Sequence, residues 1–112
     1  NRFINNEIIL EIVIVNDIHC TFICNTVQRD KNYNTQAEKE LTKLQENNKP
    51  KFELLDLDKR KELLAELNIY RQAYELLEVA FIGNKIKDGL LKLSGLIYNR
   101  ENLTFKKIEL EL

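Results

Sequence analysis

The chain has 112 residues, of which 44% are hydrophobic and 31% are charged, proportions typical of one folded domain with a modest core. Its 17 Lys and Arg residues nearly balance 18 Asp and Glu residues, giving a net charge of -1. Duplex-binding domains usually carry a basic excess, so nucleic acid is not the partner that this composition favours. We therefore expect a single folded domain over residues 1–112, and the richness in Asn, Lys and Ile suits a phage or mobile element.

Residues 7–28 are predicted to form an N-terminal antiparallel β-hairpin. They are dense in Ile, Val, Phe and Thr and are divided by Asn16-Asp17. A three-residue loop would place Ile12 and Ile14 on the same face as Ile18 and Phe22, whereas a two-residue loop would mix polar and apolar faces. The longer loop is therefore the predicted register.

His19, Cys20 and Cys24 are the only clustered residues of the types that bind metals. On a strand, the Cα atoms of the two cysteines would lie about 13 Å apart, while a disulfide needs about 7 Å or less. His19 would point away from both thiols. We therefore predict free, buried thiols, no metal site, no cofactor, no Cys-His nucleophile, and a reducing, cytoplasmic location.

The middle of the chain carries clear helix boundaries. Thr35 and Glu38 have the spacing of a capping box, which predicts a helix from there to about Asn47. Pro50 then prevents its continuation. Asp56 or Asp58 is the expected cap of the next helix.

That helix, predicted over residues 56–83, has two apolar stripes rather than one. A helix of this kind must be packed from two sides. The small-residue stripe lets a neighbour approach closely, and it comprises Ala65, Ile69, Ala73, Leu76 and Ala80. The large-residue stripe begins at Leu63 and continues with the five residues predicted to bind a protein partner: Leu67, Tyr70, Tyr74, Leu77 and Phe81.

Gly83 is predicted to end the central helix, and Asn84 to cap another helix that carries Ile86, Leu90, Leu93 and Ile97. Because Gly95 interrupts this stripe, residues 96–98 are expected to be either helical or extended. Ile108, Leu110 and Leu112 alternate with Glu109 and Glu111, which predicts a C-terminal strand beside the hairpin. The predicted fold is therefore α+β, with a hairpin, two to three helices and a C-terminal strand joining the sheet.

The segment of helix, Gly83 and helix loosely resembles a helix-turn-helix motif. The resemblance implies that Lys85, Lys87 and Lys92 on the second helix would contact nucleic acid. That family usually has a small residue four positions before the turn glycine and a branched apolar residue six positions after it. This chain has Val79 and Gly89 there. We also expect no membrane span, because Glu11, Asn16 and Asp17 interrupt the long apolar tract, and no signal peptide is visible.

No catalytic residue stands out, and a single His is the only group that normally titrates near neutral pH. The sequence therefore favours a non-enzymatic protein-interaction module, such as a small regulator, inhibitor or immunity-type protein. Its partner is unknown, and a homodimer is expected because the apolar stripes exceed the available cover. The alternative hypothesis is a nucleic-acid-binding regulator.

Overall fold

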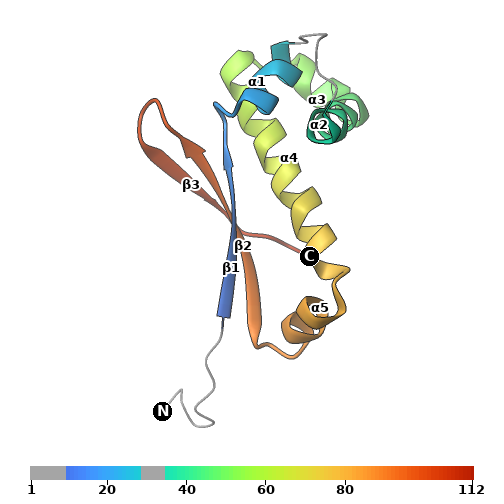
Figure 1. Cartoon of the computed structure of the whole chain (residues 1–112). Helices are drawn as coiled ribbons and strands as arrows, with labels where there is room; N and C mark the ends of the chain where they lie inside the picture. Colours follow the sequence, from blue (N-terminus) through green and yellow to red (C-terminus); the bar gives the residue numbers. More distant parts are fainter. Residues whose placement is uncertain (1–9, 29–34) are drawn as a thin grey trace.

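The computed structural model describes residues 10–28 and 35–112 and is an α+β fold, in which a long helix lies across a three-stranded sheet (Figure 1). The elements in chain order are β1 (Leu10–Asp17), α1 (Thr21–Gln28), α2 (Gln36–Asn47), α3 (Lys49–Glu53), α4 (Leu57–Leu77), α5 (Ala80–Lys87), β2 (Leu91–Asn99) and β3 (Thr104–Ile108). The predicted α+β class, the long central helix and a C-terminal strand joining the sheet are confirmed.

The strands run in the order β1-β2-β3, with β1 parallel to β2 and β2 antiparallel to β3. Leu10 lies opposite Leu91 and Asp17 opposite Tyr98, so the carboxyl ends of β1 and β2 meet at the same edge. A C-terminal strand is present, but its predicted position and neighbour are wrong. Strand β3 ends at Ile108, where the predicted alternation with Leu110 and Leu112 begins, and it pairs with β2 rather than with the N-terminal segment.

The predicted N-terminal hairpin is wrong in its second half, where the chain forms α1. Ile23, Thr26 and Val27 are buried on one side of this helix, while Phe22 is 40% exposed. Spacings of three and four residues match a helix face. The helix packs against α2 and α4, and these contacts, rather than β propensity, decide its conformation.

The predicted helix boundaries in the middle of the chain are confirmed. The hydroxyl of Thr35 accepts the amide of Glu38 at 3.2 Å and donates to the Glu38 carboxylate at 2.6 Å. Helix α2 ends at Asn47, and Pro50 occupies the first turn of α3, where its missing amide costs nothing. Asp56 caps α4 by accepting the Lys59 amide at 2.9 Å.

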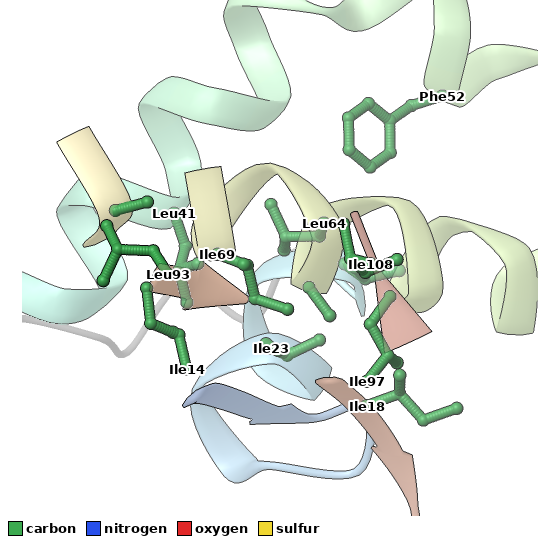
Figure 2. Packing of buried hydrophobic residues seen from close by; sticks show 13 residues of the cluster. Ile14, Ile18, Ile23, Leu41, Phe52, Leu64, Ile69, Leu93, Ile97 and Ile108 are labelled. Carbon is green, nitrogen blue, oxygen red and sulfur yellow. The ribbon is translucent and has the colours of Figure 1, made fainter. Parts of the chain in front are cut away.

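Helix α4 buries the first three residues of its small-residue stripe, as predicted, whereas Leu76 is half-buried and Ala80 is exposed at the start of α5. Ala65, Ile69 and Ala73 are 0% exposed, together with Leu64. Figure 2 shows the cluster around them, to which the sheet contributes Ile14, Leu93 and Ile97 and α1 contributes Ile23. The large-residue stripe is only partly covered.

The predicted boundaries after α4 need correction. Helix α4 ends at Leu77, and Gly83 lies inside α5, where an added Cβ would approach the Leu77 carbonyl oxygen to 2.8 Å. Helix α5 ends at Lys87, and Gly89 then turns the chain with a φ of +75°. The expected helix through Leu93 and Ile97 is therefore the strand β2, and residues 96–98 are extended.

None of the helices in the described ranges is both long and apolar enough to cross a membrane.

Candidate functional site

Polar side chains gather at the edge of the sheet where β1 and β2 end. In open sheets with parallel strands, ligands bind outside the carboxyl ends of the strands. Here β1 ends at Asp17 and is followed by His19, while β2 ends at Asn99 and is followed by Arg100 and Glu101. We name Asp17, His19, Asn99, Arg100 and Glu101 the carboxyl-end cluster.

Asp17 ties the two strand ends together. One of its carboxylate oxygens accepts the backbone amide of His19 at 2.8 Å, and the other pairs with the guanidinium of Arg100 at 2.6 Å. The Arg100 pKa is raised above its ordinary value, chiefly by this hydrogen bond to Asp17. The pair therefore fixes the turn after β1 to the turn after β2.

The imidazole of His19 also contacts the end of β2. Its Nε2 lies 3.1 Å from the side-chain oxygen of Asn99 and 2.9 Å from a carboxylate oxygen of Glu101. The same Asn99 oxygen accepts the backbone amide of Glu101, which fixes the orientation of that side-chain amide. Because both neighbours are acceptors, Nε2 carries the proton and the orientation of the ring is fixed.

A cavity of about 510 Å³ opens beside His19. The first turns of α4 form its other wall, with Asp58, Lys59 and Glu62. The pKa of Glu62 is lowered, chiefly by its hydrogen bond from Lys106 on β3 at 2.7 Å. The cavity is therefore polar and lined by charges of both signs.

A second polar group lies buried between β1 and α4, and sequence analysis did not anticipate it. Asn68 donates to the side-chain oxygen of Asn16 at 2.7 Å, and Asn16 donates to Gln72 at 2.9 Å. Asn16 and Asn68 are each 8% exposed. This network satisfies the buried polar groups at the end of β1. It thereby stabilises the strand end that carries the carboxyl-end cluster.

The residues predicted to bind a protein partner lie on α4 and α5, away from the carboxyl-end cluster. Tyr74 and Phe81 are 52% and 71% exposed, whereas Leu67, Leu77 and Tyr70 pack partly against the core. The hydroxyl of Tyr70 also donates to the Glu109 carbonyl at 3.3 Å. The structure thus leaves two of the five open to solvent.

The lysines of the helix-turn-helix resemblance do not share one helix. Lys85 and Lys87 lie in the last turn of α5, but Lys92 is in β2. Lys85 sits over the ring of Phe81, with 5.5 Å between Nζ and the ring centroid. A recognition helix of the expected kind is therefore not formed.

Cys20 and Cys24 are free, as predicted, but they are half-buried rather than buried. Cys24 lies in α1, and Cys20 directly precedes this helix. The separation expected for a strand therefore does not apply to them.

Neither a protein-family model nor a curated protein matches this sequence. The fold, however, is similar to solved structures of β-carbonic anhydrases from the fungus Aspergillus fumigatus. Wild-type CafD superposes with a TM-score of 0.74 at 19% identity, over 89% of this chain and 57% of that chain. CafA superposes with a TM-score of 0.68 at 20% identity, over 91% of this chain and 50% of that chain.

These similarities correct three predictions. The proteins that share this fold are named as enzymes, so the predicted non-enzymatic interaction module is contradicted, and so is the predicted absence of enzyme function. The characterisation as an inhibitor of phage or mobile-element origin likewise finds no support in them. This chain spans about half to three fifths of the matched proteins, and what the likeness shows is the fold.

Carbonic anhydrases generate their nucleophile on a zinc ion, and catalytic zinc sites use three protein ligands plus water. Over residues 10–28 and 35–112, no three His, Cys, Asp or Glu side chains come together as such a set. Asp17 is engaged with Arg100, and His19 with Asn99 and Glu101. The described residues therefore do not by themselves fit a catalytic zinc ion, although the fold is that of β-carbonic anhydrase structures over 89% of the chain.

Proposed function

We propose that this chain forms part of a carbonic-anhydrase-like enzyme and that the carboxyl-end cluster is its contribution to the active site. The observation that carries the proposal is the shared fold, with a TM-score of 0.74 over 89% of the chain. The position of the cluster supports it, because it occupies the edge of the sheet at which folds with parallel strands bind ligands.

His19 is the residue that we assign to proton transfer. Hydration of carbon dioxide releases a proton, which a side chain that titrates near neutral pH can accept and pass to buffer. His19 borders the 510 Å³ cavity, and its Nε2 is held by Asn99 and Glu101. These contacts orient the ring beside the cavity. A zinc ion would need ligands from outside the described residues, so no step is assigned to it.

The proposal is tested by stopped-flow measurement of carbon dioxide hydration with a pH indicator. The protein is assayed as its gene encodes it, with zinc supplied. We expect a rate above that of buffer, and we expect His19→Gln to lower that rate by about 10²-fold. Gln can still donate a hydrogen bond towards Asn99, so folding should be preserved. Its side chain cannot take up a proton, so proton transfer should be lost.

Two further measurements complete this test. Imidazole added to the buffer should restore part of the rate of His19→Gln, because a free base can replace the missing proton acceptor. Lys87→Ala, at the opposite end of the sheet, should leave the rate unchanged. A folded, zinc-supplied protein that hydrates carbon dioxide no faster than buffer would contradict the proposed function.

We also propose a reducing compartment such as the cytoplasm. The support is that Cys20 and Cys24 are both unpaired and partly accessible, a state that oxidising compartments do not favour.

A further inference from the structure

Cys20 directly precedes α1, and Cys24 lies in the first turn of this helix. The backbone amide of Cys24 donates to the Cys20 carbonyl at 2.9 Å, which is the helical bond between residues four apart. Such residues lie one above the other on the same face, with Cα atoms about 6 Å apart along the axis. The helix therefore brings together two thiols that a strand would have kept apart.

The two cysteines lie at the edge of the core, against which Cys20 is partly packed. The sulfur of Cys24 lies 3.8 Å from the carbonyl oxygen of Ile18, so its side chain points back towards the turn that Cys20 begins. Both side chains are half-buried rather than buried. Neither residue is therefore fully enclosed by the protein.

The spacing distinguishes between two ways of joining the sulfurs. A disulfide needs Cβ atoms about 3.5–4.5 Å apart, whereas residues four apart on a helix hold them about 5–6 Å apart. An intact α1 is therefore too wide for the disulfide. A metal ion with two bonds of about 2.3 Å to sulfur spans up to about 4.6 Å between sulfurs, which the helical spacing accommodates.

The number of available ligands then selects the kind of metal. Tetrahedral zinc needs four ligands, but the described residues bring no third His, Cys, Asp or Glu to the two thiols. The neighbouring His19 is engaged with Asn99 and Glu101. Monovalent copper is soft, prefers thiolates, and is satisfied by two ligands in a line.

We propose that Cys20 and Cys24 bind one monovalent copper ion as a bis-thiolate site. Each thiol releases its proton to solvent and forms one copper-sulfur bond. The copper stays monovalent, and the complex carries one net negative charge. The proposal does not depend on the function proposed above, because it requires neither zinc nor carbon dioxide.

The surroundings favour that negative charge. The backbone amide of Cys20 donates to the Asp17 carbonyl at 3.0 Å, and the Asp17 carboxylate holds the guanidinium of Arg100 at 2.6 Å, so a cation is present at the turn that leads to Cys20. Cys20 also directly precedes the amino end of α1, where the helix dipole favours anions. Both features would stabilise the bis-thiolate complex relative to two free thiols.

The test is an anaerobic titration in which the full chain competes with bicinchoninate for monovalent copper. We expect one equivalent of copper to move to each chain. Cys20→Ser and Cys24→Ser should each weaken copper binding by at least about tenfold, because one thiolate cannot complete a two-coordinate site. Thr21→Ala, an exposed change on the same helix, should bind copper like the unchanged protein.

X-ray absorption of the copper complex should show two sulfur neighbours, and circular dichroism of each Ser variant should show that it folds. Copper binding that survives in the Cys20→Ser, Cys24→Ser double variant would overturn the proposal. So would the tighter binding of one equivalent of zinc under the same conditions. Loss of carbon dioxide hydration alone would not, so failure of this site and failure of the proposed function are distinguishable.

Discussion

Gly95 shows how one residue sets the distance between the sheet and α4. It lies in the middle of β2, is buried, and faces Ile69 of α4. A Cβ at this position would lie 2.6 Å from Cγ2 of Ile69 and 3.3 Å from Cβ of Ile108. The first distance is too short for a real contact, so only glycine allows α4 to pack this closely.

We expect Gly95→Ala to lower the free energy of unfolding by about 1–3 kcal/mol, because the added methyl overpacks the contact with Ile69. Chemical denaturation measures this change. Leu has no Cγ2, so Ile69→Leu should relieve the clash. In a double-mutant cycle, the double variant should then lose at least about 0.5 kcal/mol less free energy of unfolding than the sum of the losses in the two single variants. Strict additivity would show that the clash with Ile69 is not the cause.

At the scale of the elements, one ion pair joins α4 to β3. Lys106 and Glu62 lie 2.7 Å apart and stand on different elements. The pKa of Glu62 is lowered, chiefly by the hydrogen bond from Lys106, and the pKa of Lys106 is raised, chiefly by the hydrogen bond to Glu62. Both shifts therefore favour the ionised pair in the folded protein.

The lowered pKa of Glu62 predicts a loss of stability in acid. Its contribution is fully present above the pKa that the carboxyl has in the unfolded chain, and is lost as pH falls through the lower pKa of the folded protein. Lys106→Gln should therefore reduce the loss of unfolding free energy on acidification from about pH 6 to pH 3. The difference should stay below about 1 kcal/mol, because Lys106 is largely exposed and water screens the pair.

Lys107→Gln is the matched control for this prediction. Lys107 is also in β3, but its partner Glu109 lies on the same segment, so the pair does not join two elements. We expect the stability of this variant to depend on pH as in the unchanged protein. If the free energy of unfolding of Lys106→Gln and of the unchanged protein depends on pH in the same way, the ion pair does not cause the loss of stability in acid.

At the scale of the whole molecule, the homodimer remains a prediction. Tyr74 and Phe81 are exposed on α4 and α5 without cover from other described elements. Sedimentation velocity should therefore show a species heavier than the 13.3 kDa monomer. Tyr74→Ser with Phe81→Ser should shift it towards the monomer. Leu54→Ser, a change at an 89% exposed leucine, should not. A sharp monomer for the unchanged protein would contradict the prediction.

Features that depend on residues close together in the chain could be predicted from the amino-acid sequence. The capping box of Thr35 and Glu38, the cap at Asp56 and the end of α2 before Pro50 each involve residues a few positions apart. The buried face of α4 was predicted in part, because the period of Ala65, Ile69 and Ala73 marks a helix face. Lys61 and Asn68 are buried on that face as well, although their polarity indicates solvent exposure. Such local patterns work without knowledge of distant partners.

The remaining features, including the candidate site, depend on contacts between residues that are distant in the chain. A short apolar run such as Thr21–Gln28 suits a strand or a buried helix equally well, and its contacts with α2 and α4 made the choice. The parallel pairing of β1 with β2 joins Asp17 to Tyr98, far apart in sequence, and thereby brings His19 beside Asn99 and Glu101. Strand pairing over such separations depends on the energy of the whole packed core, which no local pattern contains.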